Sequence, residues 1–103
     1  MILEIAHINV KAGCEESFEN NAAAAVNILR SAKGVGNINL RRSIEYPNHY
    51  KLLVEWESVE CHMEDFQRSE EFKEWRRLLS PFFESTPEVE HTRETLTVSK
   101  IAN

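Results

Sequence analysis

A run of aromatic side chains with two arginines occupies residues 69–83, which read "SEEFKEWRRLLSPFF". At helical spacing, one stripe of this run holds Phe72, Trp75, Leu79 and either Phe82 or Phe83. Arg76 follows Phe72 by four residues and therefore lies beside the stripe. A guanidinium is planar and always charged, so it can stack on an aromatic ligand or hold an oxyanion. The run predicts either the wall of a pocket for a flat, electron-rich ligand or a packed helix with a surface arginine.

A histidine and further aromatics lie just before this run. A short helix over about residues 59–67 puts these side chains on one face: Val59, His62, Met63 and Phe66. Imidazole titrates near neutral pH, so His62 is either a group that hydrogen-bonds or deprotonates a ligand or a packed histidine. Trp56 is either a stacking partner for a ligand or a core aromatic facing the helices. His91 begins the last extended stretch and faces either the pocket or a dimer seam.

The elements that would position these side chains follow from hydrophobic spacing and turn residues. The pattern predicts strands at 2–10, 35–46, 50–57 and 89–98, a helix at about 15–32, and shorter helices at about 59–67 and from Ser69 to near Pro81. The order is β-α-β-β-α-β with the second helical region split in two. This order is typical of an α+β, ferredoxin-like subunit, with a four-stranded antiparallel sheet and helices on one face. We expect residues 1–103 to form one domain.

The predicted sheet carries apolar side chains on both faces. In the first strand Ile2, Ala6, Ile8 and Val10 point one way, whereas Leu3, Ile5, His7 and Asn9 point the other way. A sheet with one wet face alternates apolar and polar residues more cleanly. Because the helices can cover only one face, we expect a homodimer that buries the other.

Bulk properties exclude several partners and sites. The net charge of −5 argues against nucleic acid and against an anionic membrane surface. The two cysteines, Cys14 and Cys61, have no metal-ligand spacing and are expected to be reduced. The first strand begins at Ile2, which leaves no room for a signal peptide, and no apolar run is long enough to span a membrane, so we expect a cytoplasmic protein. No motif for a bound cofactor or metal is present, and we expect none of either.

Several segments in this order resemble the antibiotic biosynthesis monooxygenase domain family. They are "VEWES" and a short helix, "FQRSEEFKEW", "PFF" and "VEH", and the resemblance extends from Ile2 to about Thr95. It implies a dimeric α+β barrel built from ferredoxin-like subunits. In one branch of the family it also implies oxidation of polycyclic phenols or quinols by molecular oxygen without metal or flavin. The substrate anion then gives an electron to oxygen itself, and the protein supplies a dry cavity and stabilises the oxyanion.

The resemblance also implies roles for particular positions. The tryptophan and arginine of the phenol-oxidising branch fall on Trp56 and Arg76, while its asparagine and tyrosine fall on Leu52 and His62. We therefore expect Arg76, His62 and Trp56 to be catalytic, and the following side chains to bind the substrate: Leu52, Phe66, Phe72, Trp75, Phe82 and His91. A haem-degrading branch uses Asn, Trp and His where this chain has Ala6, Phe66 and Arg76, so haem degradation is disfavoured. The remaining alternative is a non-catalytic dimeric module that binds a small ligand.

Overall fold

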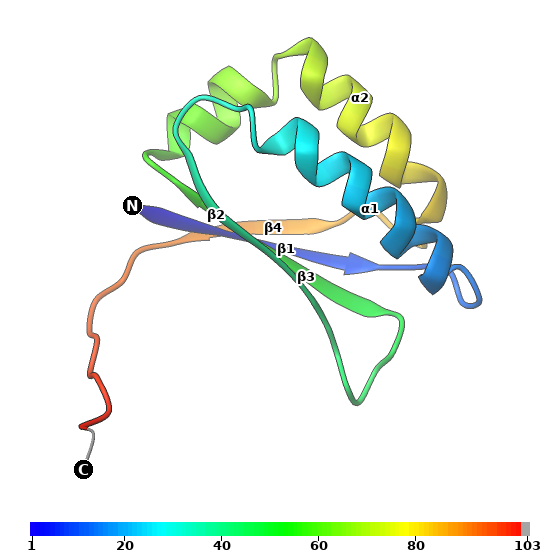
Figure 1. The fold of residues 1–103 in the computed structure, drawn as a ribbon, viewed down its shortest axis with the longest axis horizontal. Helices are drawn as coiled ribbons and strands as arrows, with labels where there is room; N and C mark the ends of the chain where they lie inside the picture. Colours follow the sequence, from blue (N-terminus) through cyan, green and yellow to red (C-terminus); the bar gives the residue numbers. More distant parts are fainter. Residues whose placement is uncertain (102–103) are drawn as a thin grey trace.

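The computed structural model describes residues 1–101, in which strands and helices alternate as the sequence predicts (Figure 1). The elements are β1 (Ile2–Asn9), α1 (Glu15–Leu29), β2 (Val35–Arg42), β3 (His49–Trp56), the π-helix η1 (Cys61–Phe66), α2 (Glu70–Leu79), the 3-10 helix η2 (Ser80–Phe82) and β4 (Glu88–Thr92). The strands form one sheet in the order β2-β3-β1-β4 with antiparallel pairing throughout. The predicted ferredoxin-like α+β fold is confirmed. No helix within residues 1–101 is both long and apolar enough to cross a membrane.

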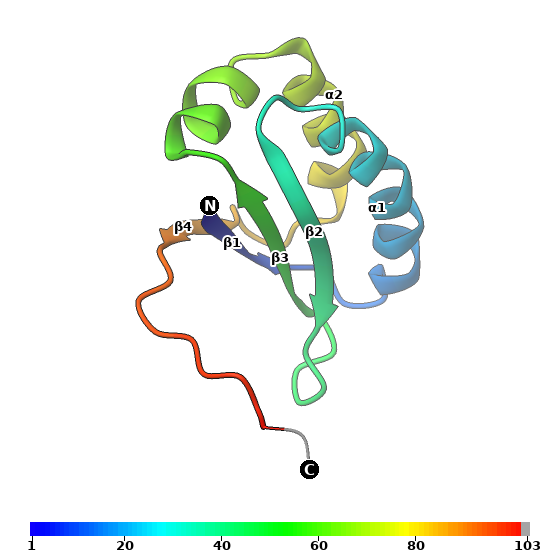
Figure 2. The same ribbon diagram turned by 60° about the vertical axis from the view of Figure 1, so that its left-hand side comes forward.

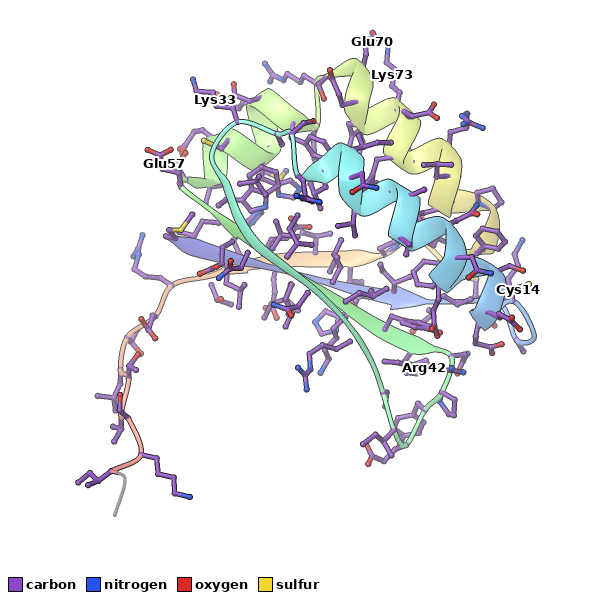
Figure 3. The ribbon with its side chains drawn as sticks, in the orientation of Figure 1. Cys14, Lys33, Arg42, Glu57, Glu70 and Lys73 are labelled. Atoms are coloured by element: carbon purple, nitrogen blue, oxygen red, sulfur yellow. The ribbon has the colours of Figure 1, made fainter. Side chains whose placement is uncertain are left out.

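The helices lie on one side of the sheet and leave its other face open (Figures 1 and 2). Strand residues of one parity face the helices and are buried, among them Ala6, Ile8, Tyr50, Leu52, Val54 and Trp56. From the helix layer α1 contributes Phe18, Ala22, Ala25 and Leu29, whose spacing keeps them on one face. Figure 3 shows side chains from both layers in the space between them. On the open face Leu3, Ile5 and Leu53 remain half-buried without a helix above them.

Local capping fixes where α2 begins and therefore which of its side chains face the sheet. Ser69 Oγ accepts a hydrogen bond from the backbone N–H of Phe72, at 3.2 Å, and Glu70 and Glu71 occupy the first turn. Glu70 and Lys73 point away from the sheet and pair at 3.0 Å (Figure 3). The inner face of α2 is left to Phe72, Trp75 and Leu79, of which Leu79 is buried.

The segment before α2 is helical, as predicted, but its central part is a π-helix and not an α-helix. The π-helix η1 spans Cys61–Phe66 and is preceded by Ser58, whose Oγ accepts a hydrogen bond from the backbone N–H of Cys61 at 3.3 Å. A π turn is wider than an α turn and is uncommon. In η1 the side chains of Cys61, His62 and Phe66 are all buried against the sheet.

Two predicted strands are shorter than their sequence pattern suggests. The strand predicted at 35–46 ends at Arg42, and the chain turns over residues 43–48, where Tyr46 N–H donates to Ser43 Oγ at 3.1 Å. The strand predicted at 89–98 is β4, Glu88–Thr92. Thr92 pairs with Leu3, almost at the start of β1, so the residues after it have no neighbouring strand in this chain. Residues 93–101 therefore run away from the domain without regular structure (Figure 1).

Candidate functional site

A cavity of about 530 Å³ lies between the helix layer and the sheet. Its floor is formed by Glu4 and Ala6 from β1, Leu52 from β3 and Val89 from β4. Its walls and rim are formed by Leu29, His62, Phe66, Gln67, Phe72, Trp75, Arg76, Ser80, Phe83, Ser85, Thr86 and Pro87. This volume is in the range of pockets that bind small organic molecules.

One wall of the cavity is a continuous set of aromatic rings. The ring of Phe66 meets Phe72 edge-on with centroids 5.4 Å apart, and Phe72 lies parallel to Trp75 with centroids 5.9 Å apart. These contacts hold the rings of η1 and α2 in one arrangement. The wall offers a flat ligand stacking surfaces and keeps water away from one side of it.

Arg76 lines the same cavity from the exposed side of the wall. Its neighbour Arg77 is engaged elsewhere, because its Nε and Nη2 donate to the carboxylate of Glu74 at 2.9 and 2.5 Å. Arg76 has no salt-bridge partner within the described part of the chain. Its guanidinium is therefore available to an anionic or aromatic ligand at the cavity mouth.

The floor of the cavity contains a buried carboxylate. Glu4 is only 5% exposed and lies on the helix-facing side of β1 with Ala6 and Ile8. Its Oε1 accepts a hydrogen bond from Trp56 Nε1–H at 2.8 Å. In the sheet register Ile2 lies opposite Trp56 and Glu4 lies opposite Val54, so Trp56 is the diagonal neighbour of Glu4.

Two histidines lie close to Glu4, namely His62 in η1 above the sheet and His91 in β4 beside it. His62 is 4% exposed, and its Nε2 lies 3.4 Å from Glu4 Oε1. Its Nδ1 lies 2.9 Å from Nε2 of His91, so a single hydrogen bond joins the two rings. His91 lies directly opposite Glu4 in the pairing of β1 with β4. The His62 ring also stacks on Trp56, with centroids 5.1 Å apart and planes 18° from parallel.

Burial favours the neutral forms of both Glu4 and His62. It raises the pKa of Glu4 to about 7, although the hydrogen bond from Trp56 acts in the opposite direction. Burial, and secondarily the charge repulsion from His91, lowers the pKa of His62 to about 4. Near neutral pH the imidazole of His62 is therefore neutral, while the carboxyl group of Glu4 titrates. Their contact at 3.4 Å is not a fixed ion pair. A carboxyl group that titrates near pH 7 inside a cavity is a candidate for acid–base chemistry.

The structure brings six of the residues predicted from the sequence to the cavity: Leu52, His62, Phe66, Phe72, Trp75 and Arg76. Trp56 is completely buried and reaches the cavity only through its contacts with Glu4 and His62. Phe82 packs beside the core while Phe83 takes the place at the rim. His91 does not line the cavity, and its ring contacts that of His62.

Glu4 is the residue that the sequence-based prediction missed. It shares its strand parity with Ala6, Ile8 and Val10, so a carboxylate interrupts an otherwise apolar face. That interruption is a signal for a functional group, since an ionisable side chain is rarely buried without a partner. Within residues 1–101 no group of three or more His, Cys, Asp or Glu side chains is placed to hold a metal ion.

The chain is similar to known sequences along most of its length. The sequence profile of the family described as antibiotic biosynthesis monooxygenase matches residues 1–78. An uncharacterized protein of Bacillus subtilis (strain 168), YczJ, is 38% identical over 94 residues, which cover 91% of this chain and 99% of that protein.

Solved structures have the same fold. A protein from Bordetella bronchiseptica that is assigned to the antibiotic biosynthesis monooxygenases is 43% identical, with a TM-score of 0.90 and coverage of 92% of this chain and 97% of that one. SnoaB, a cofactor-independent oxygenase from Streptomyces nogalater, has a TM-score of 0.82 at 17% identity, with coverage of 96% of this chain and 97% of that one. At 17% identity the likeness to SnoaB extends to the fold alone.

Proposed function

Because the chain belongs to the antibiotic biosynthesis monooxygenase family, we propose that it is a cofactor-independent monooxygenase of a small aromatic, phenolic or quinol-like substrate. The observation that carries this proposal is the cavity with aromatic walls and an available guanidinium at its mouth. SnoaB, which has the same fold, is a cofactor-independent oxygenase, and this supports oxygen chemistry that needs no cofactor. The molecular oxygen is the oxidant in this proposal, and the substrate is the electron donor.

The arrangement fits the requirements of such a reaction. An ionised phenol is electron-rich enough to pass an electron to oxygen directly. The stacked rings of Phe72 and Trp75 orient a flat substrate and keep one side of it dry. Arg76 pairs with the developing oxyanion, where a charge-assisted hydrogen bond is stronger than a neutral one.

Replacing Arg76 with alanine is expected to lower kcat/KM for oxygen uptake about tenfold or more, because an oxyanion partner is removed. The measurement is oxygen consumption with a panel of hydroquinones and anthrones in the presence of a chelator. Arg77→Ala is the matched control, since Arg77 is engaged with Glu74, and it should leave the rate nearly unchanged. Equal effects of the two variants would remove Arg76 from the mechanism.

The alternative of a non-catalytic binding module has a distinct outcome in the same experiment. Saturable binding of the quinols without any oxygen uptake across the panel would overturn the monooxygenase proposal and leave a ligand-binding protein. The cavity is open to a ligand, because Phe66 and Trp75 line the space and do not fill it.

We also propose that a second copy of the chain covers the open sheet face. The supporting observation is an apolar patch of Leu3, Ile5 and Leu53 on this face, where Ile5 pairs with Leu53 and all three side chains are half-buried. The helices lie on the other side of the sheet (Figure 2). Leu53→Glu is expected to convert a dimer into a monomer, since it places a charge in the apolar seam. Sedimentation equilibrium measures this change, with the exposed Ala23→Glu on α1 as the control. A wild-type chain that sediments as a monomer would overturn the proposal.

A further inference from the structure

The cavity floor holds one ionisable group that the proposed reaction has not yet used. Glu4 lines the cavity, and both of its close polar contacts, with Trp56 and His62, are made through Oε1. Oε2 has no hydrogen-bond partner within residues 1–101, so it is the oxygen that is free to contact a bound ligand. A phenol must lose its O–H proton before it becomes a good electron donor, so the cavity needs a proton acceptor.

We propose that Glu4 is the proton acceptor of this site and that its substrate is a phenol or quinol bound as the neutral molecule. The proposal rests on the proposed monooxygenase function and specifies its first chemical step. In that step the substrate O–H bond breaks, and the proton forms a new O–H bond with Oε2 of Glu4. The electron pair stays on the substrate oxygen as a phenolate, beside Arg76. A ring carbon of the phenolate then forms a C–O bond with molecular oxygen, and Glu4 returns its proton to the resulting peroxide anion. Loss of the C–H proton from that carbon breaks the O–O bond, forms the second carbonyl of a quinone and releases hydroxide, which takes up this proton and leaves as water.

The surroundings of Glu4 suit this role better than those of His62. The titratable groups that face Glu4 within residues 1–101 are His62 from η1 and His91 from β4, while Arg76 from α2 shares the cavity. On the remaining sides β3 presents Val54 and Trp56, and α1 presents Leu29, none of which is charged. No lysine or arginine side chain within residues 1–101 forms a salt bridge with this carboxylate, which keeps it basic. The lowered pKa of His62 makes that imidazole a weak base.

His62 and Trp56 act on Glu4 as positioning residues. The indole N–H of Trp56 holds Oε1 at 2.8 Å, and the His62 ring is packed between Glu4, Trp56 and His91. With Oε1 held, the carboxyl group can rotate little, so Oε2 is left for contact with a ligand. This arrangement resembles other sites in which a hydrogen-bonded partner orients a general base.

The kinetic test compares the wild type with Glu4→Gln, which keeps the shape and can still accept the hydrogen bond from Trp56. Glu4→Gln should lower kcat/KM about 100-fold for quinols that are neutral at the assay pH. The loss should shrink for phenols that are already ionised in solution. The wild-type kcat/KM should rise as pH rises through about 7, because the base must be ionised, and Glu4→Gln should lack this inflection. The exposed Glu84→Gln is the control and should behave as the wild type.

A binding test separates this proposal from the proposed function, because it needs no turnover. The probe is 4-nitrophenol under anaerobic conditions above about pH 8, where both it and Glu4 are ionised. The wild type should take up one proton per bound probe, measured with an indicator dye, whereas Glu4→Gln should take up none. Equal proton uptake by the two proteins would overturn the role of Glu4 whatever the turnover.

The remaining outcomes are also decisive. Proton uptake by the wild type alone, without oxygen consumption on any quinol, would keep Glu4 as the acceptor and overturn the monooxygenase. A wild type that binds 4-nitrophenol without taking up a proton would overturn the role of Glu4, while oxygen uptake on the quinol panel would still support the monooxygenase. Circular dichroism of each variant ensures that a negative result reflects the site and not a loss of folding.

Discussion

Replacing Trp56 with alanine is expected to lower the free energy of unfolding by about 3–5 kcal/mol. The side chain is 0% exposed, and its ring packs against His62 and Phe66 at centroid distances of 5.1 and 5.8 Å. The substitution opens a cavity at the centre of the domain and also removes the N–H that holds Glu4. Urea denaturation at neutral pH measures the change.

Trp56→Phe separates the packing of Trp56 from its hydrogen bond, and Trp75→Ala compares it with a less buried tryptophan. Trp56→Phe keeps most of the ring volume but leaves Glu4 Oε1 without its donor, which should cost about 1–3 kcal/mol. Trp75→Ala removes the same side chain from the cavity wall, where it is only half-buried, and should cost less than Trp56→Ala. A larger loss at Trp75 than at Trp56 would contradict the placement of the core around Trp56.

The second large effect is a change in how stability depends on pH. Glu4 titrates near 4.5 in the unfolded chain and at about 7 in the folded one. Between these values the unfolded state releases the proton and the folded state keeps it, so the wild type loses stability as pH rises. Glu4→Gln lacks this loss. Its stability relative to the wild type should therefore grow by about 3 kcal/mol between the two pH values.

His62 contributes the opposite slope over an overlapping range. Its pKa falls from 6.5 in the unfolded chain to about 4 in the folded one, so between these values the unfolded state binds the extra proton. Stability from this group therefore rises with pH from about 4 to 6.5. The two slopes nearly cancel in the wild type, which should show a flat profile, whereas Glu4→Gln should reveal the rise due to His62.

Urea denaturation over a pH series measures these profiles. The matched control is Glu84→Gln, whose exposed carboxyl group should leave the profile parallel to the wild type. Parallel profiles for Glu4→Gln and the wild type would mean that Glu4 is ionised in the folded state, held in an ion pair by a charged His62. That result would also remove the basis for Glu4 as a proton acceptor near neutral pH.

The order of elements was predictable because local patterns define most of them. Alternation in β1 and β3, the periodicity of α1 and the cap at Ser69 are properties of neighbouring residues.

The ends of the strands were less predictable. Residues 44–46 and 93–98 have strand-like sequences, but a strand needs a partner, and β1 offers none beyond Leu3. The turn at 43–48 likewise depends on hydrogen bonds that close the hairpin, such as Ser43 N–H to His49 O at 2.9 Å.

For the site, the sequence by itself determined the aromatic wall and the position of Arg76 beside it, because helical spacing fixes which side chains share a face. It also placed Glu4 on an apolar strand face, without indicating what would surround it. Only the tertiary structure determined which groups surround Glu4. Trp56 reaches Glu4 across 52 residues, and His62 and His91 meet across 29, through the antiparallel register and the π-helix above it. The shifted pKa of Glu4 follows from desolvation by these packed layers, which exist only when all of them are assembled.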